Sequence, residues 1–195
     1  MTAHQLDSLL AKIDAINAED PNRDIVDGTS VARELRYAQR LTEWVLRLAP
    51  AASEALRLAA RGQHIARWRI PRAEFPMTRA GYLKWRERLK HLHADLVEQL
   101  MREAGYDAAA VDAVRSLILK RRPAEDPEMQ ALEDALCLLF LEAQLADLRQ
   151  KTPDDTMREV IRKTWQKMSP RGRDVALQIP LPDREREFLR ETLAS

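Results

Sequence analysis

Two histidines and one carboxylate stand where helical periodicity turns them toward apolar surroundings. His64, His93 and Asp134 each recur at three- and four-residue spacing with apolar residues of their own predicted helices. These apolar residues are Leu56, Ala60, Leu89, Leu96, Val97, Leu100, Ala131, Cys137, Leu138 and Leu141. A buried polar or charged group is unfavourable unless it has a partner. We therefore expect the three side chains to converge inside the protein.

Such a cluster is typical of two kinds of chemistry. Imidazole and carboxylate groups on facing helices can hold a divalent metal ion, and they can transfer protons as general acid and base. The predicted metal ligands are His64, His93, Asp134 and Glu133. Glu34 or Glu43, on the second predicted helix, is a further candidate ligand. The alternative is that each group is an ordinary core residue, hydrogen-bonded to a neighbour.

Residues 61–86 interleave arginines with aromatic residues, the most distinctive composition in the chain. A guanidinium group offers paired donors to phosphate or carboxylate and also stacks on flat rings. The predicted anion-binding residues are Arg67, Arg72 and Arg79, and the predicted stacking residues are Trp68, Tyr82 and Trp85. The alternative is a solvated basic face whose aromatic residues belong to the core, which the nearby Glu74 and Glu87 favour.

The composition indicates that helices position these groups. Gly is scarce, β-branched residues are scattered, and long stretches are rich in Ala, Leu, Arg and Glu. A length of 195 residues suits one continuous core. We therefore predict an all-α, single-domain bundle of about seven to nine helices over residues 1–195.

Capping residues and prolines predict where these helices begin and end. The predicted N-caps are Ser30 and Asp107, Asp126 followed by Pro127 is a further start signal, and a long helix is expected from Thr78. Helices are expected before residue 21, at 31–49, 50–68, 78–104, 107–120 and 126–150, and after 152. A polar loop is expected through Asp27 and Gly28, a Pro-containing loop at 70–77, and a C-terminal tail with one helix at 170–195. The helix at 126–150 is apolar on nearly every face, so we expect it at the centre.

The balance of charges limits the classes of partner that we expect. Thirty-two Lys and Arg oppose 31 Asp and Glu, so with a formal net charge of +1 we expect no general attraction to nucleic acid or to a membrane. The N-terminal residues lack a basic segment followed by an apolar run, which predicts a cytoplasmic protein. Cys137 lies in an apolar run and is expected in the core rather than as a nucleophile.

Longer motifs occur along most of the chain. In the first half they are Glu34-Leu35-Arg36-Tyr37, Gln63-His64-Ile65-Ala66-Arg67-Trp68, Ile70-Pro71-Arg72, Pro76-Met77 and Arg79-Ala80-Gly81-Tyr82-Leu83. Later they are Leu132-Glu133-Asp134, Phe140-Leu141-Glu142 and Lys163-Thr164-Trp165. With these motifs the chain resembles a bacterial and fungal family, domain of unknown function 4202. That resemblance implies no established reaction.

Residues 58–65 and the later Asp134 carry a second, more distant resemblance. They are similar to the HD superfamily of helical, metal-dependent phosphohydrolases, which carry a His, an adjacent His-Asp pair and a distant Asp. Asp134 matches the final Asp, but Gln63 and His64 fall at the positions of the His-Asp pair, and the first His falls near Tyr37. The resemblance implies an HD-like fold and phosphohydrolase activity. At Tyr37, Gln63 and His64 the chain departs from the residue pattern of that superfamily.

Two functional hypotheses follow. The first is an HD-like enzyme that acts on a small phosphorylated or otherwise anionic substrate, with His64, His93 and Asp134 at its centre and a divalent metal ion as the expected cofactor. The second is a non-catalytic ligand-binding or protein-interaction module that uses the Arg and aromatic surface of residues 61–86.

Overall fold

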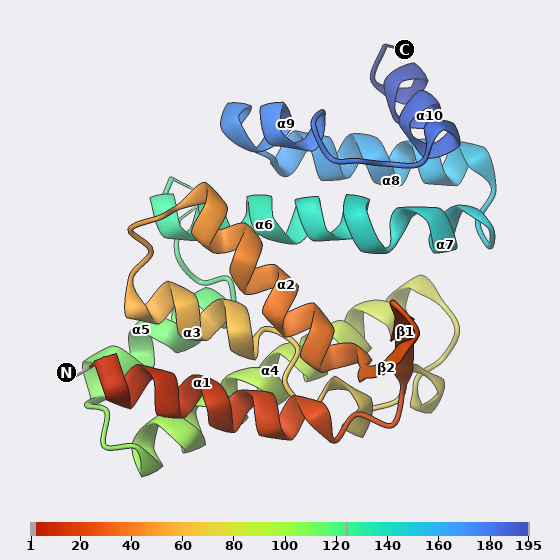
Figure 1. Ribbon diagram of the computed structural model, residues 1–195. Helices are drawn as coiled ribbons and strands as arrows, with labels where there is room; N and C mark the ends of the chain where they lie inside the picture. Colours follow the sequence, from red (N-terminus) through yellow and green to blue (C-terminus); the bar gives the residue numbers. More distant parts are fainter. Residues whose placement is uncertain (1–2, 124, 195) are drawn as a thin grey trace.

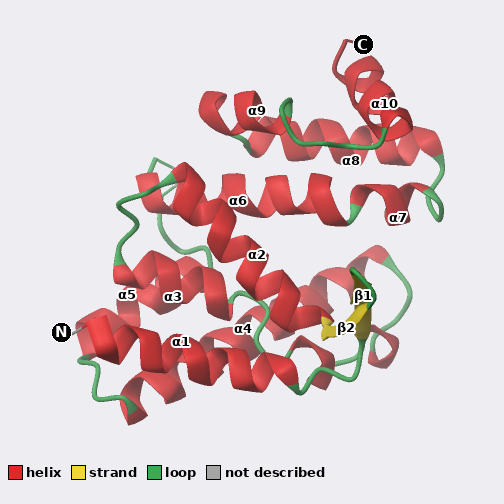
Figure 2. Ribbon diagram, in the orientation of Figure 1, coloured by secondary structure: helices red, strands yellow, loops and turns green. Residues whose placement is uncertain are grey.

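The computed structural model describes residues 3–123 and 125–194, and most of them are helical (Figure 1 and Figure 2). The α-helices are α1 Ala3–Ala18, α2 Arg33–Leu48, α3 Glu54–Gly62, α4 Arg79–Glu103, α5 Ala108–Ile118, α6 Pro127–Ala143, α7 Leu145–Arg149, α8 Asp154–Lys167, α9 Pro170–Ala176 and α10 Asp183–Ala194. Two short 3-10 helices, η1 Arg67–Arg69 and η2 Arg72–Glu74, lie between α3 and α4. The predicted all-α fold class is confirmed.

The helices of the described residues outnumber the seven to nine expected, because two predicted segments are divided. The helix expected at 126–150 is interrupted at Gln144, after which the chain continues as the short α7. In the C-terminal tail the Ser169 side chain accepts a hydrogen bond from the Gly172 N–H and thereby caps α9. Helices this short have too few turns for a clear apolar stripe.

The segment expected as a loop after α1 is a β-hairpin, drawn as yellow arrows in Figure 2. Strand β1 Arg23–Val26 pairs antiparallel with strand β2 Thr29–Ala32. Asp27 and Gly28 join them, both with positive φ, 48° and 77°. Asp-Gly is a preferred pair for such a turn, because both of its central residues adopt the left-handed region.

Local capping signals locate several helix starts correctly. Thr78, Asp107 and Asp126, where helices are expected to start, each accept a hydrogen bond from a backbone N–H two or three residues later and so act as caps. The prediction that Ser30 caps α2 is wrong, because Ser30 lies in β2. The start of α3 is also wrong, because the helix begins after its cap Ser53 rather than at Pro50.

The helices stack in layers, with α6 between the N-terminal and C-terminal parts of the fold (Figure 1). Helix α6 contacts α2 and α3 on one side and α8 and α9 on the other, while α10 packs on α8. The layers meet through fully buried aliphatic side chains, including Leu9, Ile13, Leu41, Leu56, Leu132 and Leu138. No helix in the described ranges combines the length and the apolar character needed to cross a bilayer.

Candidate functional site

The candidate site begins at the turn that follows α3. Gly62 ends this helix in close contact with α4, because a Cβ atom here would lie 2.4 Å from Val97 Cγ2. The close approach brings His64 next to His93, which lies one helical turn before Val97. The two imidazole ring centroids are 5.8 Å apart at an interplanar angle of 36°. Two of the three predicted residues are therefore neighbours.

The same turn presents Arg67 beside His64. Between them, the buried residue Ala66 has a left-handed backbone, φ 54° and ψ 29°, which L-amino acids other than Asn and Asp rarely adopt. Arg67 Nη1 lies 3.4 Å from His64 Nε2. Because a guanidinium group can only donate, Nε2 is the acceptor and the proton of the neutral ring is on Nδ1.

His64 also contacts α2 through Tyr37 and Glu34. The Tyr37 ring stacks on the imidazole with centroids 4.0 Å apart and an interplanar angle of 11°. Glu34 Oε2 lies 3.3 Å from His64 Nδ1, and Glu34 Oε1 lies 3.7 Å from Arg67 Nε. The His64 side chain is 20% exposed and the Glu34 side chain is 10% exposed.

Burial and neighbouring charges set the proton affinities of this pair. Burial raises the pKa of Glu34 from 4.5 to about 7, although Arg67 opposes the rise. Burial, followed by the charges of Arg67, Arg86 and Lys120, lowers the pKa of His64 well below 6.5. At neutral pH the ring is therefore uncharged, while the carboxyl group divides between its two protonation states. A carboxyl pKa near 7 suits a general acid/base group.

His93 forms the buried side of the site, with 2% exposure. Its Nδ1–H donates to the Ile65 carbonyl oxygen at 2.8 Å, which leaves a lone pair on Nε2. Burial and then the neighbouring His64 lower the pKa of His93 to about 3, so the ring stays neutral. Nε2 is buried and has no hydrogen-bond partner within the described part of the chain. A buried acceptor without a hydrogen bond is unfavourable, so a hydrogen bond to Nε2 from water or a ligand would be stabilising.

Positively charged side chains from three separate segments lie near the uncharged His64 ring. Arg67 belongs to η1, Arg86 to α4, and Lys120 follows α5, and all three lower the pKa of His64. Lys120 is also ion-paired with Glu133 of α6. Arg86 is exposed, so part of this charge faces solvent. Although the chain carries a net charge of only +1, the surroundings of His64 are locally cationic and favour an anion.

Asp134 does not join the two histidines as predicted. Its carboxylate accepts hydrogen bonds from the Ser169 N–H at 2.8 Å, the Ser169 hydroxyl at 2.5 Å and the Gln130 amide at 2.9 Å. A Cβ atom at Gly172 would lie 2.6 Å from Asp134 Cγ, so the first turn of α9 packs directly on this carboxylate. The side chain is buried as its periodicity predicts, but its partner is the start of α9.

The four predicted metal ligands, His64, His93, Asp134 and Glu133, do not form one set. Within residues 3–123 and 125–194, no three His, Cys, Asp or Glu side chains are grouped so that they could hold a metal ion. Of the two further candidates, Glu34 lies against His64, whereas Glu43 is 60% exposed and pairs with Arg40 at 2.5 Å. Of the six candidate ligands, the structure brings together His64, His93 and Glu34.

The three predicted anion-binding arginines have different surroundings. Arg67 lies against the His64 ring. Arg72 instead clamps the loop between η2 and α4. Its guanidinium donates to the carbonyl oxygens of Phe75 at 2.9 Å, Pro76 at 2.8 Å and Thr78 at 3.4 Å. Arg79 is exposed at the start of α4. Arg67 therefore lies beside His64, whereas Arg72 holds the loop before α4.

The predicted stacking residues also differ. Trp85 is buried, its Nε1–H donates to the Ile70 carbonyl oxygen at 2.9 Å, and the Arg67 guanidinium lies 4.7 Å from its ring centroid. Trp68 packs against the hydrophobic core. Tyr82 is 42% exposed, with its ring 5.8 Å from that of Trp85. The Trp85 ring therefore packs against the Arg67 guanidinium group, and the Tyr82 ring is partly exposed to solvent.

Sequence reasoning misses three residues of the site, Tyr37, Arg86 and Lys120. One signal exists for Tyr37, because it stands three residues after Glu34 and therefore shares its helical face. Arg86 belongs to the predicted Arg and aromatic stretch 61–86, whereas Lys120 comes from a separate segment and no sequence spacing relates it to His64.

Comparison with known proteins places the chain in a family. A family model described as domain of unknown function (DUF4202) matches residues 7–189. The chain belongs to this family. No curated protein and no solved structure matches the chain. The DUF4202 match includes the whole candidate site, from Glu34 to Glu133.

Proposed function

We propose that this DUF4202 protein is an enzyme that binds a small phosphorylated or otherwise anionic substrate beside His64 and transfers a proton through the Glu34–His64 pair. The observation that carries the proposal is the 3.3 Å separation of Glu34 Oε2 from His64 Nδ1. Glu34 Oε2 has no hydrogen-bond partner among the described residues, but a carboxylate this close favours the ring proton on Nδ1 by its charge and leaves the lone pair of Nε2 for the substrate. Acid/base pairs of carboxylate and imidazole divide their roles in this way.

The local cations support an anionic substrate. Arg67 Nη1 already lies at hydrogen-bond distance from His64 Nε2, so an anion that accepts from this guanidinium group also lies next to the imidazole lone pair. Arg86 and Lys120 add positive charge at the same place. A hydrogen bond to a charged group contributes about 1.5–3 kcal/mol, so loss of Arg67 should weaken binding about tenfold to a hundredfold.

The proposal assigns proton transfer to side chains rather than to a metal ion, because the four predicted ligands are not grouped in the described residues. The relationship to HD phosphohydrolases stays a prediction on which the proposal does not depend. Tyr37 and Gln63 stand near or at the positions where that superfamily carries histidines.

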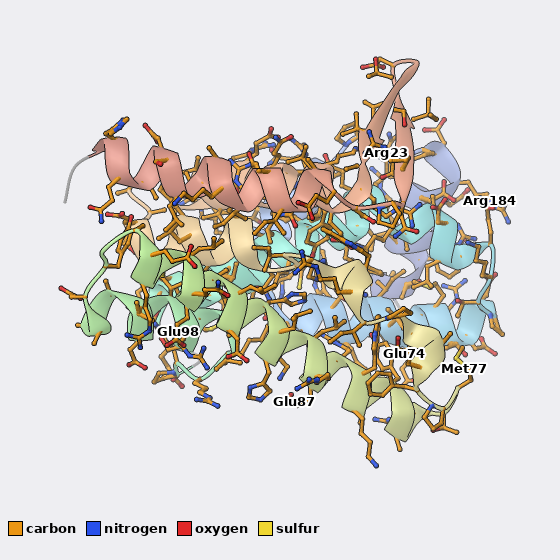
Figure 3. The ribbon with its side chains drawn as sticks, turned by 90° about the horizontal axis from the view of Figure 1, so that it is seen from below. Arg23, Glu74, Met77, Glu87, Glu98 and Arg184 are labelled. Atoms are coloured by element: carbon orange, nitrogen blue, oxygen red, sulfur yellow. The ribbon has the colours of Figure 1, made fainter. Side chains whose placement is uncertain are left out.

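The second candidate, a non-catalytic interaction module, is favoured by one specific observation. Met77 is 81% exposed on the loop that Arg72 clamps, and Figure 3 shows Met77 and Glu74 at the same end of the molecule. An exposed apolar side chain on a clamped loop suits contact with a partner. In this candidate His64 and His93 have structural roles.

Anion binding is tested directly by following the His64 ring by NMR while inorganic phosphate and a panel of phosphorylated metabolites are added. A bound anion should raise the pKa of His64, because negative charge favours the imidazolium form. Arg67→Gln should weaken this response about tenfold or more. The matched control is Arg69→Gln on the same 3-10 helix, whose side chain is 46% exposed. A His64 resonance that no anion perturbs contradicts the proposal.

Catalysis is tested separately by screening the same compounds for turnover. Glu34→Gln and His64→Gln should abolish turnover by removing the proton-transfer groups, while Arg67 should still bind the compound. Binding without turnover of any compound, together with capture of a partner that depends on Met77, would support the interaction module instead.

A further inference from the structure

Asn17, near the end of α1, is tied to the strained residue of the site. The Asn17 side chain is fully buried. It contacts Ala66, which lies 49 residues later in the sequence. The Ala66 backbone N–H donates to Asn17 Oδ1 at 3.3 Å. Asn17 Nδ2 is buried and has no hydrogen-bond partner among residues 3–123 and 125–194. The contact with Ala66 is therefore the hydrogen bond that accounts for a polar side chain at this depth.

Ala66 needs such a partner because its backbone is in the left-handed region, φ 54°. Two other hydrogen bonds lie within this turn, from the Arg67 N–H to the His64 carbonyl oxygen and from the Arg69 N–H to the Ala66 carbonyl oxygen, both at 3.0 Å, but Asn17 is the acceptor of the Ala66 N–H itself. Loss of that acceptor favours the return of the alanine to a right-handed or extended conformation. That change would separate His64 from Arg67, which stand on the two sides of Ala66. Ala66 is 0% exposed, so in the folded protein its N–H depends on an acceptor from the protein rather than on bulk water.

We propose that Asn17 is a positioning residue, whose side-chain oxygen holds Ala66 in the left-handed conformation that presents His64 and Arg67 together. This inference rests on the proposed function for its significance, but its geometry can be tested without any ligand. Because α1 supplies the acceptor, the first helix of the fold determines the arrangement of a site built by α2, α4 and the turn after α3.

A double-mutant cycle between Asn17 and Ala66 tests the proposal. In Asn17→Ala the turn should relax and His64 should gain solvent, so its pKa should rise toward 6.5, measured by NMR titration without ligand. Ala66→Gly alone should leave the pKa of His64 unchanged, because glycine adopts positive φ freely. In the Ala66→Gly background, Asn17→Ala should have a smaller effect. An equal effect in both backgrounds, or none in either, overturns the proposal.

A control separates positioning from general loss of stability. Thr42 is also a buried polar residue, but its hydroxyl donates within its own helix to the Ala38 carbonyl oxygen at 2.8 Å. Thr42→Ala should lower the melting temperature without moving the pKa of His64. If Thr42→Ala raises this pKa as much as Asn17→Ala does, the role of Asn17 is merely structural and the proposal fails.

Two further measurements keep the inference independent of folding and of the proposed function. If Asn17→Ala does not fold, amide exchange in the unmodified protein decides. The Ala66 N–H should exchange far more slowly than that of the exposed Ala73, and equal rates overturn the proposal.

Inorganic phosphate titration then reports on function, with affinity about tenfold weaker in Asn17→Ala. If phosphate binds neither protein while the cycle behaves as expected, the proposed function fails and the positioning role stands.

Discussion

Glu34 Oε2 lies 3.3 Å from His64 Nδ1, in a pair whose side chains are 10% and 20% exposed. Burial holds each group away from its ordinary pKa, raising that of the carboxyl group and lowering that of the imidazole. The protonation of both groups therefore depends on the packing around them.

The pH dependence of stability should reveal Glu34. Burial raises its folded pKa from 4.5 to about 7, so its stabilising contribution is complete below pH 4.5 and lost as the pH rises through 7. In Glu34→Gln this loss disappears. The free energy of unfolding of the unmodified protein, relative to that variant, should fall by about 2–3 kcal/mol between pH 4.5 and 8, measured by urea titration. Glu43→Gln, at an exposed position of α2, keeps Glu34 and should therefore retain the loss.

His93 should have the opposite pH dependence. Its folded pKa of about 3 lies below the ordinary 6.5, so its contribution is complete above pH 6.5 and lost as the pH falls toward 3. At pH 5 this amounts to about 2 kcal/mol relative to pH 7. His93→Asn can keep a donor near the Ile65 carbonyl but cannot titrate, so its stability should change less with acid. His91→Asn, at a side chain that is 40% exposed, should retain the acid loss.

The cations around His64 should control its proton affinity. Arg86→Gln and Lys120→Gln should each raise the pKa of His64, because each removes a positive charge that disfavours the imidazolium form. Both variants should also weaken phosphate binding. Arg88→Gln makes the same charge change at an exposed position of the same helix and should leave the ring unaffected. NMR titration of the His64 ring checks all three, and a shift as large for Arg88→Gln would argue against a localised site.

Asp134 should matter for stability and not for the site. Asp134→Ala removes the acceptor for the Ser169 N–H and hydroxyl, which should lower the free energy of unfolding by about 1–3 kcal/mol. Gly172→Ala should have a similar effect, about 1–3 kcal/mol, because its new Cβ atom meets the same carboxylate. Denaturant titration measures both losses. A changed His64 pKa or phosphate affinity in either variant would show that Asp134 does belong to the site.

Sequence alone determines the features that depend on local interactions. Helical periodicity places His93 and Asp134 on buried faces, and the structure agrees, with exposures of 2% and 3%. The helix starts expected at Thr78 and Asp107 are correct because a capping side-chain oxygen and the N–H from which it accepts lie within one turn. The all-α class follows from composition for the same reason, since helix hydrogen bonds join residues four apart.

Only the tertiary structure decides which buried polar groups meet. Periodicity gives the direction of a side chain from its own helix axis, but it does not say which helix lies opposite, so Asp134 faces α9 and Glu34 faces His64. The left-handed Ala66 is another such case, because a contact with Asn17 of α1 overrides the preference of an alanine. The site depends on contacts between residues distant in sequence, and these form when the helices pack.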